Sequence, residues 1–275
     1  MIYIILPTFG RLSSTENFIN NSGLLQDNHA MFIVIDAHPS KVLNDYFKNI
    51  PNIKVIEETN AWWVQAINVG MEYLKTNVNV KDEDIITFAN NDVIINENNI
   101  SKVYDFVRRN PRSIVHPQTL DEKNDFISSG AIIKSWFPYI TIHPTNIKKN
   151  VEIDLGTARF LSFSGVVFNT SPYIEKNLIQ YQGDNFFTYF LKKNHKIKTF
   201  ILANAYCIVD ESETGLKNNN IQSFKDLFHS FTSIRSANNL RYRYYFVRCF
   251  HPRISAIAIV LSMTINSTIK FILKK

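Results

Sequence analysis

The sequence predicts an α/β fold with a mostly parallel sheet flanked by helices, because short apolar runs alternate with helical segments along its first 110 residues. Such runs are typical of strands buried on both faces, and their spacing fits strands joined by crossover helices. Three of the four runs end at polar clusters or carboxylates. The expected strands cover residues 2–6, 32–36, 53–56 and 85–89.

Helices are expected between these strands, and the second half changes character. The segment 110–165 is rich in proline, histidine and aromatic residues with weak alternation, which indicates irregular or antiparallel structure. The expected helices cover residues 13–25, 42–48 and 181–193, and residues 60–74 are expected to form a loop that leads into a helix. The later strands cover 160–168, 197–202 and 205–209.

Composition narrows the class of protein. Of 275 residues, 45% are hydrophobic and 20% are charged, which is typical of a globular chain. Only Cys207 and Cys249 occur, so a disulfide framework is excluded and a reducing compartment fits. The first residues enter a strand pattern with no basic leader or cleavage site, so we expect no secretory signal and a cytoplasmic protein.

The positive charge is concentrated near the C-terminus. From Arg235 onward the chain has 8 basic and no acidic residues, which leaves 22 basic against 24 acidic residues before it. The segment 241–248 interleaves cations with aromatic rings, a pattern compatible with a membrane interface or with single-stranded nucleic acid. The apolar segment that follows favours an anionic membrane surface, and we expect no nucleic-acid partner.

Residues 254–273 are long enough to span a bilayer, but they contain five polar or charged side chains: Thr264, Asn266, Ser267, Thr268 and Lys270. We therefore expect an interfacial helix that lies on the inner face of the cell membrane, steered by its cations. A full span is the weaker alternative. A helix packed on the body or an oligomer contact would explain the same pattern.

The strand 85–89 ends at Asn90, Asn91 and Asp92. In open α/β sheets, ligands bind at the carboxyl ends of the strands, so Asp92 is the first candidate for a metal ligand. Asn and Asp also favour turns, and a simple turn explains this cluster equally well. Asp36 ends a second apolar strand, where a carboxylate has few structural reasons to occur.

Five motifs follow one another along the chain: Leu6–Arg11, Ile33–Asp36, Asn60–Gly70, Phe88–Asp92 and Gln180–Phe187. In this order they resemble the motifs of the family-2 glycosyltransferases with the GT-A fold. The segment 60–70 resembles the pattern Asn-x-Gly-x-Ala-x-Ala-x-Asn-x-Gly, with Trp62 and Val64 in place of small residues. The metal motif keeps only its last acid. The tail, the Trp62–Trp63 pair and the Gly-Asp at 183–184 resemble bacterial rhamnosyltransferase-like members.

The resemblance implies an inverting enzyme that uses a nucleotide-diphosphate sugar. Asp92 would hold Mg²⁺ or Mn²⁺ against the diphosphate, with Asn90 and Asn91 beside it. Asp184 would be the general base that deprotonates the acceptor hydroxyl. An Asp at the start of a helix is also a common N-cap, which is the plain alternative for Asp184.

The resemblance also implies which residues contact the nucleotide. Thr8 and Arg11 are expected near the phosphates or ribose, Asp36 near the base or ribose, and Gln65 and Asn68 along the 60–70 loop. Arg11 is otherwise a solvated residue at a helix start, and Asn68 a polar group on a helix face. Trp62 and Trp63 would stack on a ligand or pack, and we favour packing for at least one. A further metal ligand is sought among Asp210, Glu211 and His229.

These expectations divide the chain into a GT-A domain, residues 1–230, and a membrane-associating helical tail, residues 231–275. Residues 1–110 would be the nucleotide-binding half and 111–230 the acceptor and catalytic half. The expected acceptor is a glycan, and the resemblance implies that it is linked to a lipid and belongs to bacterial surface polysaccharide synthesis. A nucleotidyltransferase and a non-catalytic sugar-nucleotide or membrane-binding module are the alternatives, and the oligomeric state stays open.

Overall fold

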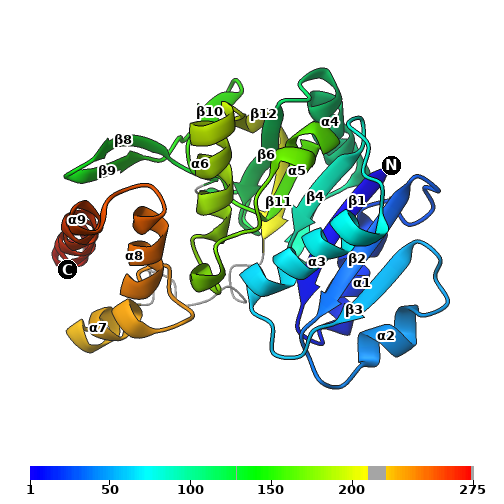
Figure 1. The fold of residues 1–275 in the computed structure, drawn as a ribbon, viewed down its shortest axis with the longest axis horizontal. Helices are drawn as coiled ribbons and strands as arrows, with labels where there is room; N and C mark the ends of the chain where they lie inside the picture. Colours follow the sequence, from blue (N-terminus) through cyan, green and yellow to red (C-terminus); the bar gives the residue numbers. More distant parts are fainter. Residues whose placement is uncertain (128, 210–220, 274–275) are drawn as a thin grey trace.

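A computed structural model of the chain describes residues 1–127, 129–209 and 221–273, and its centre is one large mixed sheet (Figure 1). The sheet runs in the order β10-β12-β6-β11-β4-β1-β2-β3, with most neighbouring strands parallel. Its strands are β1 (Ile2–Thr8), β2 (Ala30–Asp36), β3 (Ile53–Glu57), β4 (Ile85–Ala89), β6 (Ser113–Leu120), β10 (Val151–Ile153), β11 (Phe160–Ser164) and β12 (Lys198–Val209).

Helices cover both faces of this sheet, as the alternation of strands and helices predicts. Neighbouring residues of one strand point to opposite faces: Ile5 packs in the core beneath α3 and α6, and Ile4 packs in the core beneath α1, α2 and α4. The helices are α1 (Leu12–Asn21), α2 (Val42–Phe47), α3 (Trp63–Asn77), α4 (Glu97–Arg109), α5 (Gly165–Thr170) and α6 (Gly183–His195).

The segment 110–165 contributes more to the sheet than its composition indicates. β6 lies inside the sheet and is parallel to β12. Later in the chain, β10 is antiparallel to β12, and β11 is antiparallel to both β4 and β6. Short pieces complete the sheet and its surroundings. They are β5 (Val93–Ile94), which pairs with β12, β7 (Phe126–Ile127), which pairs with β6, and the separate hairpin β8 (Ile132–Trp136) and β9 (Tyr139–Ile142).

Two expected elements differ in extent. The strand expected over 160–168 ends at Ser164, where the chain turns into α5 because Gly165 passes directly over the backbone of Lys81, leaving no room for a Cβ atom. The two strands expected over 197–202 and 205–209 form one strand, β12, with an irregularity between Leu202 and Tyr206.

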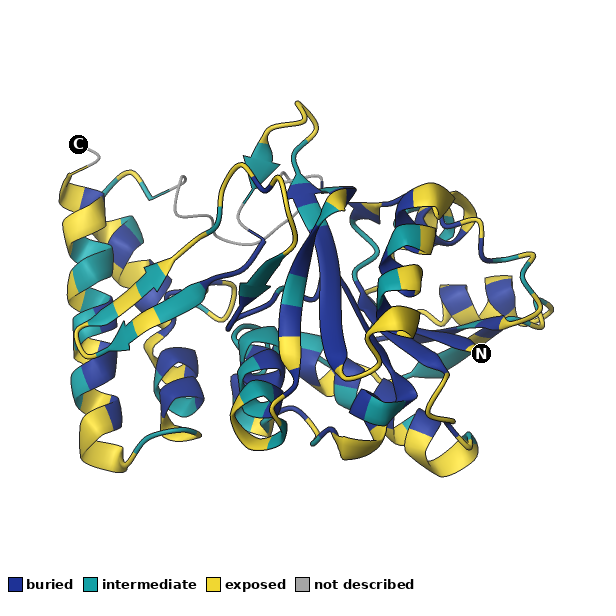
Figure 2. Ribbon diagram, turned by 90° about the horizontal axis from the view of Figure 1, so that it is seen from above, coloured by how far each residue is buried: buried dark blue, intermediate teal, exposed yellow. Residues whose placement is uncertain are grey.

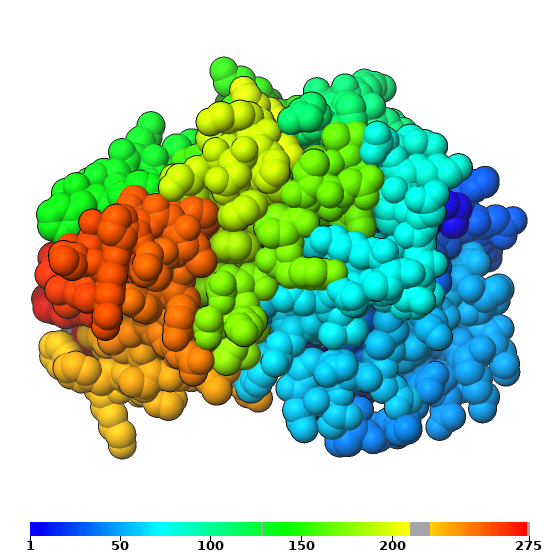
Figure 3. Space-filling view, viewed as in Figure 1, coloured from blue at the N-terminus to red at the C-terminus, as the bar shows by residue number. Residues whose placement is uncertain are grey.

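Three helices within residues 221–273 form one end of the molecule, beside the β8–β9 hairpin (Figures 1 and 3). Phe246 and Ala256 belong to the same core cluster as Phe187 of α6, so these helices pack on the rest of the chain. Within the described residues, one helix is apolar and long enough to cross a membrane by length and composition, α9. The three are α7 (Phe224–Thr232), α8 (Leu240–Arg248) and α9 (Arg253–Ile272).

α9 has a buried face and an exposed face, and both are apolar (Figure 2). The buried face packs Ala256, Ile259 and Met263 against the core. The exposed face carries large apolar side chains along the whole helix: Ile254, Ile257, Leu261, Ile265, Ile269 and Ile272. Their spacing of three and four residues places them in one continuous stripe, which we call the α9 stripe.

Candidate active site

The polar ends of β1, β2 and β4 meet at one edge of the sheet. Thr8 lies opposite Asp36 in the register of β1 and β2. The Asn91 side-chain amide, just beyond β4, donates hydrogen bonds to the hydroxyls of Thr8 at 3.0 Å and Thr15 at 3.2 Å. Three of the residues predicted from the sequence therefore share one small region, which we call the donor edge.

Asp36 is the most enclosed group at the donor edge, with no exposed surface. Its Oδ1 accepts hydrogen bonds from the backbone N–H groups of Gly10 and His38, both at 3.0 Å. Its Oδ2 has no hydrogen-bond partner within the described part of the chain. A buried carboxylate oxygen is usually paired, so this oxygen is suited to receive a donor from a ligand.

The loop that holds Asp36 depends on Gly10. Gly10 has a φ of +63°, and a Cβ atom there would lie 2.7 Å from Cγ of the His38 ring. A side chain would therefore be strained by its backbone and would also collide with His38. The ring of the exposed Phe9 packs edge-on against His38 at a centroid distance of 4.9 Å. Together these contacts give the donor edge an apolar rim.

Asn90 joins the donor edge to α3 and to the second half of the chain. Its side-chain oxygen accepts a hydrogen bond from Nε1 of Trp63 at 2.9 Å, and its backbone N–H donates to the carbonyl of Arg159 at 3.1 Å. Trp63 also donates its backbone N–H to the side chain of Gln180 at 3.1 Å. Trp63 thus has the packing role that we favoured for one of the two tryptophans.

The remaining predicted nucleotide contacts lie around this edge. Arg11 is exposed at the start of α1. Gln65 accepts the backbone N–H of Trp62 at 2.9 Å, which ties down the first turn of α3. Both amide atoms of Asn68 bond to the backbone of Ile174, at 2.9 and 2.8 Å. These bonds give Gln65 and Asn68 structural roles, and their contacts with a nucleotide remain predictions.

Asp184 lies in the first turn of α6, where Gln182 is the N-cap and makes no side-chain cap bond. The Asp184 carboxylate instead accepts the backbone N–H of Asn185 at 2.8 Å. Burial raises the pKa of Asp184, although hydrogen bonds from Asn185 and Ala158 and the charge of Arg159 act in the opposite direction. A raised pKa makes a carboxylate a better general base.

α6 starts close to α3, which brings Asp184 toward the donor edge. A Cβ atom at Gly183 would lie 2.5 Å from Cγ2 of Val64 and 3.1 Å from the Trp63 ring, so only glycine allows this approach. Trp63 in turn bonds to Asn90. A short chain of contacts therefore connects the end of β4 with the start of α6.

Arg159 is a site residue that sequence reasoning missed. Its charge acts on the Asp184 carboxylate, and both Arg159 and Asp92 act on the buried thiol of Cys207, whose pKa is raised to about 11, chiefly by burial. Arg159 is therefore near Asp184, and both Arg159 and Asp92 are near Cys207. The sequence carries a weak signal, because Arg159 is the only Lys or Arg between Lys149 and Lys176 and directly precedes an apolar strand.

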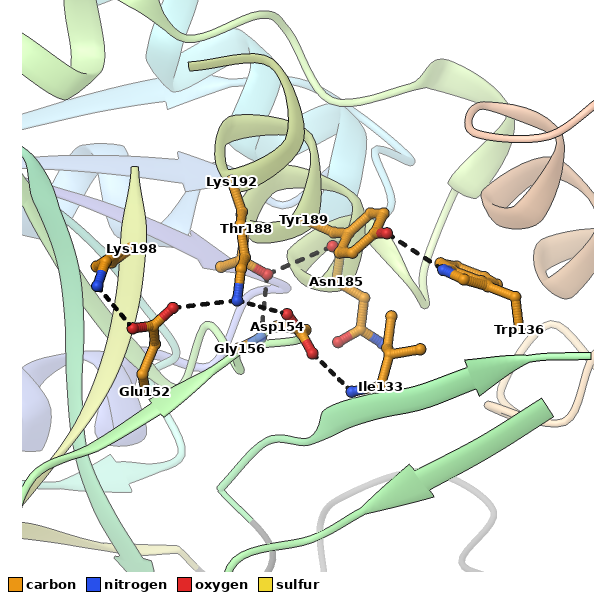
Figure 4. A network of polar contacts seen from close by, with 10 residues as sticks. All are labelled: Ile133, Trp136, Glu152, Asp154, Gly156, Asn185, Thr188, Tyr189, Lys192 and Lys198. Carbon is orange, nitrogen blue, oxygen red and sulfur yellow. Dashed lines mark hydrogen bonds and ion pairs between the residues drawn. The ribbon is translucent and has the colours of Figure 1, made fainter. Parts of the chain in front are cut away.

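A polar network fixes the segment before Arg159 against α6 (Figure 4). Lys192 forms ion pairs with Asp154 at 2.7 Å and Glu152 at 3.1 Å, and Lys198 pairs with Glu152 at 3.0 Å. Nearby, the N–H of Gly156 donates to the Thr188 hydroxyl at 3.0 Å, and that hydroxyl donates to the carbonyl of Asp184. The network therefore sets the position of Asp184 relative to Arg159.

The metal site expected at Asp92 remains a prediction. Val93, the next residue, pairs with Val209 at the end of β12. Asp210 and Glu211 lie outside the described residues, and His229 is exposed on α7. The described part of the chain has no group of three or more His, Cys, Asp and Glu residues placed to hold a metal. One carboxylate suffices when substrate phosphates and water supply the other oxygens, as is common for Mg²⁺.

The sequence profile described as "Glycosyl transferase family 2" matches residues 3–174, more than half of the chain. The chain belongs to this family. Its matched region includes the donor edge and Arg159 and ends before Asp184. A comparison with curated protein sequences finds no significant match.

Solved structures confirm the fold of this family-2 glycosyltransferase as GT-A. The structure of GalNAc-T7 with UDP, GalNAc and Mn²⁺ has a TM-score of 0.59 at 11% identity and covers 84% of this chain, which spans 50% of that protein's length. The structure of S. aureus TarS 1–349 has a TM-score of 0.57 at 14% identity, with 98% of this chain and 72% of that chain covered. The predicted α/β sheet with a C-terminal helix is therefore confirmed.

Proposed function

We propose that the chain transfers a sugar, with inversion, from a nucleotide-diphosphate donor to a hydroxyl of a glycan acceptor. The observation that supports this proposal is the chain of contacts between two regions: Asn90, at the end of β4, bonds to Trp63 and to the backbone of Arg159, and Trp63 packs against the start of α6, where Asp184 lies. Inverting transfer needs a site for the departing diphosphate and a base for the acceptor, and each region supplies one of them.

On the donor side, Asp36 and Thr8 bind the nucleoside. The unpaired Oδ2 of Asp36 accepts a hydrogen bond from the base or ribose. Asp92 would hold Mg²⁺ or Mn²⁺, and the bound ion would supply Lewis-acid stabilisation of the diphosphate charge. Asn90 and Asn91 fix the end of β4 through their bonds to Trp63 and Thr8. The Mn²⁺ and UDP named with the GalNAc-T7 structure agree with this assignment.

On the acceptor side, Asp184 removes the proton from the attacking hydroxyl. The charge of Arg159 acts on the Asp184 carboxylate, and its guanidinium is suited to the negative charge that develops on the departing diphosphate. Because the hydroxyl attacks the anomeric carbon from the face opposite the diphosphate, a base and a leaving-group site on opposite sides of the sugar give inversion.

The α9 stripe supports a location on the membrane surface. One face of α9 packs on the protein, so the helix is suited to lie in the interface with its stripe in the lipid. The neighbouring hairpin adds the exposed side chains of Phe137, Ile140 and Ile142. We place the protein on the inner face of a bacterial cell membrane, where a lipid-linked glycan in surface polysaccharide synthesis is the acceptor.

The test combines binding with turnover. A thermal-shift screen of nucleotide diphosphates, with and without Mn²⁺, identifies the donor nucleotide, and release of that nucleotide from its sugar conjugates is then measured. Release by the wild-type chain that is lost in Asp92→Ala supports a transferase. Tight nucleotide binding with no release, with or without glycan acceptors, would instead identify a binding module, and formation of a sugar nucleotide from a sugar phosphate would identify a nucleotidyltransferase.

A further inference from the structure

A large cavity lies at the tail end of the molecule, between the β8–β9 hairpin and helices α7 to α9. Its volume is about 920 Å³, within the range of sites that bind a small molecule. Apolar side chains of the hairpin, α7 and α9 line it, among them Ile140, Leu227 and Met263. Two cations, Arg243 and Lys270, also line it.

Arg243 is buried in the wall of this cavity, with 6% of its surface exposed. Its Nη2 donates hydrogen bonds to Asn238 at 2.5 Å and to Ser267 at 2.9 Å. Its Nε and Nη1 are buried and have no hydrogen-bond partner among the described residues. Burial lowers the pKa of Arg243 to about 10. The cavity thus holds a desolvated cation with two unused donors, an arrangement that is costly unless an anion completes it.

Lys270 lies on the same face of α9 as Met263 and Ser267, because residues three, four and seven apart share one side of a helix. Its side chain is exposed at the rim of the cavity. The hairpin wall is held in place by α9, since the Asn266 side chain donates to the carbonyl of Tyr139 at 2.8 Å. Arg243 and Lys270 thus line the same cavity, and guanidinium and ammonium donors are both suited to a phosphate.

The apolar walls restrict the molecule that carries this phosphate. A free phosphate would use Arg243 and Lys270 but would leave the exposed apolar wall of the cavity, to which Ile140 contributes, in contact with water. Ile140 also belongs to the exposed apolar side chains of the hairpin, so the cavity adjoins the face assigned to the membrane. We propose that this cavity binds the phosphate head of a lipid, with the phosphate on Arg243 and the chain along the apolar wall.

The cavity is connected to the catalytic region by packing. Tyr242, next to Arg243 on α8, packs its ring on Tyr181 at a centroid distance of 6.5 Å, and Tyr181 is close enough for Asp184 to influence its pKa. In a glycosyltransferase, a lipid phosphate held here anchors the lipid-linked acceptor near Asp184. That role rests on the proposed function, whereas the binding itself does not depend on it.

The test is a calorimetric titration of the full chain with octyl phosphate, without any nucleotide sugar. Octyl glucoside, which has the same chain and no charge, and inorganic phosphate are titrated in parallel. Octyl phosphate is expected to bind more tightly than either, and Arg243→Gln to weaken its binding about tenfold or more, as for a lost charge-assisted bond. Lys270→Gln is expected to weaken it about threefold, as for an exposed charge. Arg253→Gln, which removes an exposed cation of α9 outside the cavity, is the matched control and is expected to change nothing.

Three results would overturn the proposal: equal binding of octyl glucoside, equal binding of inorganic phosphate, or unchanged binding in Arg243→Gln. If circular dichroism shows that Arg243→Gln does not fold, the decision passes to Lys270→Gln, and unchanged binding there overturns the proposal. Failure of this site leaves nucleotide-sugar turnover intact. Failure of the proposed function instead appears as absent turnover in the wild-type chain, whatever octyl phosphate does.

Discussion

The donor edge and the start of α6 position their functional groups in different ways. At the donor edge, Thr8 and Asp36 face each other because two parallel strands end in register. Asp184, in contrast, owes its position to side-chain contacts: the close approach of Gly183 to Val64 and the network around Lys192. Repetitive backbone pairing therefore supports the first region, and a few individual side chains support the second.

This difference predicts how the two regions respond to substitution. A conservative change at the donor edge should affect only the contact it removes, because the ladder of backbone hydrogen bonds stays intact. A change in the network behind Asp184 should affect both stability and catalysis. Three substitutions test this contrast and a fourth tests the α9 stripe, and they follow in the order of their expected effect on sugar transfer.

The largest effect is expected for Asp184→Asn. The amide cannot take the acceptor proton, so the transfer rate should fall by about 10² to 10⁴, the usual contribution of a general base. The measurement is kcat with saturating donor and acceptor. Asp105→Asn on the exposed face of α4 is the matched control. Transfer within a few-fold of wild type by a folded Asp184→Asn protein would remove the residue from the mechanism.

The pH dependence of sugar transfer by the wild-type chain independently tests the general-base role of Asp184. A general base acts in its ionised form, so transfer should fall as the pH drops through its pKa. Because burial raises that pKa above the ordinary value of 3.8, the acid limb of kcat/KM should lie at a higher pH than for an exposed Asp. Loss of the limb in Asp184→Asn would assign it to this residue.

The second substitution, Asp36→Asn, tests the donor edge. Asn keeps Oδ1 for the N–H groups of Gly10 and His38 and replaces only Oδ2, the oxygen without a partner. Nucleotide affinity should fall about tenfold, as for a hydrogen bond to a charged group, while the melting temperature stays close to wild type. Asp45→Asn, on the exposed surface of α2, serves as its control. Unchanged nucleotide affinity would show that Asp36 only holds the loop.

The third substitution, Lys192→Met, tests the network. Asp154 is buried with 8% of its surface exposed, so removing Lys192 leaves a poorly solvated carboxylate without its ion pair. Since Lys192 is itself about one-third exposed, the free energy of unfolding should fall by only about 1 to 2 kcal/mol. Transfer should also fall a few-fold as Asp184 shifts. Lys198 is more exposed and, among the described residues, forms its ion pair with Glu152 alone. Lys198→Met should therefore lower the free energy of unfolding, measured in urea, by less than half as much.

The same network should make stability depend on pH. Burial alone would raise the pKa of Glu152, but the hydrogen bonds from Lys198 and Lys192 outweigh it and lower that pKa below 4.5. Burial opposes ionisation of Lys192, and its bonds to Asp154 and Glu152 raise its pKa above 10.5. The stabilisation should be complete between these values, decline below pH 4.5 and decline again above pH 10.5. Lys192→Met should remove the alkaline decline.

The smallest effect on transfer is expected for the double substitution Leu261→Glu with Ile265→Glu in the α9 stripe. Both side chains are more than half exposed, so folding and transfer to a soluble acceptor should be unchanged. Binding to vesicles of anionic lipid should fall strongly, because apolar area is lost and two negative charges are added. Asn28→Glu, at an exposed site in the other half, is the control for added charge. Unchanged vesicle binding would separate the α9 stripe from the membrane.

The sequence predicted the first half of the fold and the donor edge well, for a physical reason. Strands buried on both faces are apolar throughout, and their polar ends must meet when they are parallel neighbours. The position of β6 could not be predicted, because Pro117 argues against an interior strand. In the structure, the ladder on one side of β6 is interrupted there: β11 pairs with it only at Ile114 and Val115, and β7 only beyond Pro117.

The charged residues were harder to predict than the strands. Arg159 comes next to the end of β4, where its carbonyl accepts the N–H of Asn90, only through the folding of a segment with weak periodicity. Arg243 was counted among the cations of the basic tail, which were expected to steer it to the membrane, yet α8 and α9 bury it. Whether a cation faces water or a cavity depends on how the helices pack around it, and no local pattern in the sequence carries that information.

The continuity of the central sheet limits how this enzyme can move. β11 pairs with β4 over five residues, from Phe160 opposite Ala89 to Ser164 opposite Ile85. A continuous ladder of backbone hydrogen bonds therefore joins the two halves of the domain. The two halves therefore cannot open and close by a hinge motion. Substrate entry and product exit must therefore depend on loops and side chains at the rim, and small-angle X-ray scattering should record the same overall dimensions with and without nucleotide.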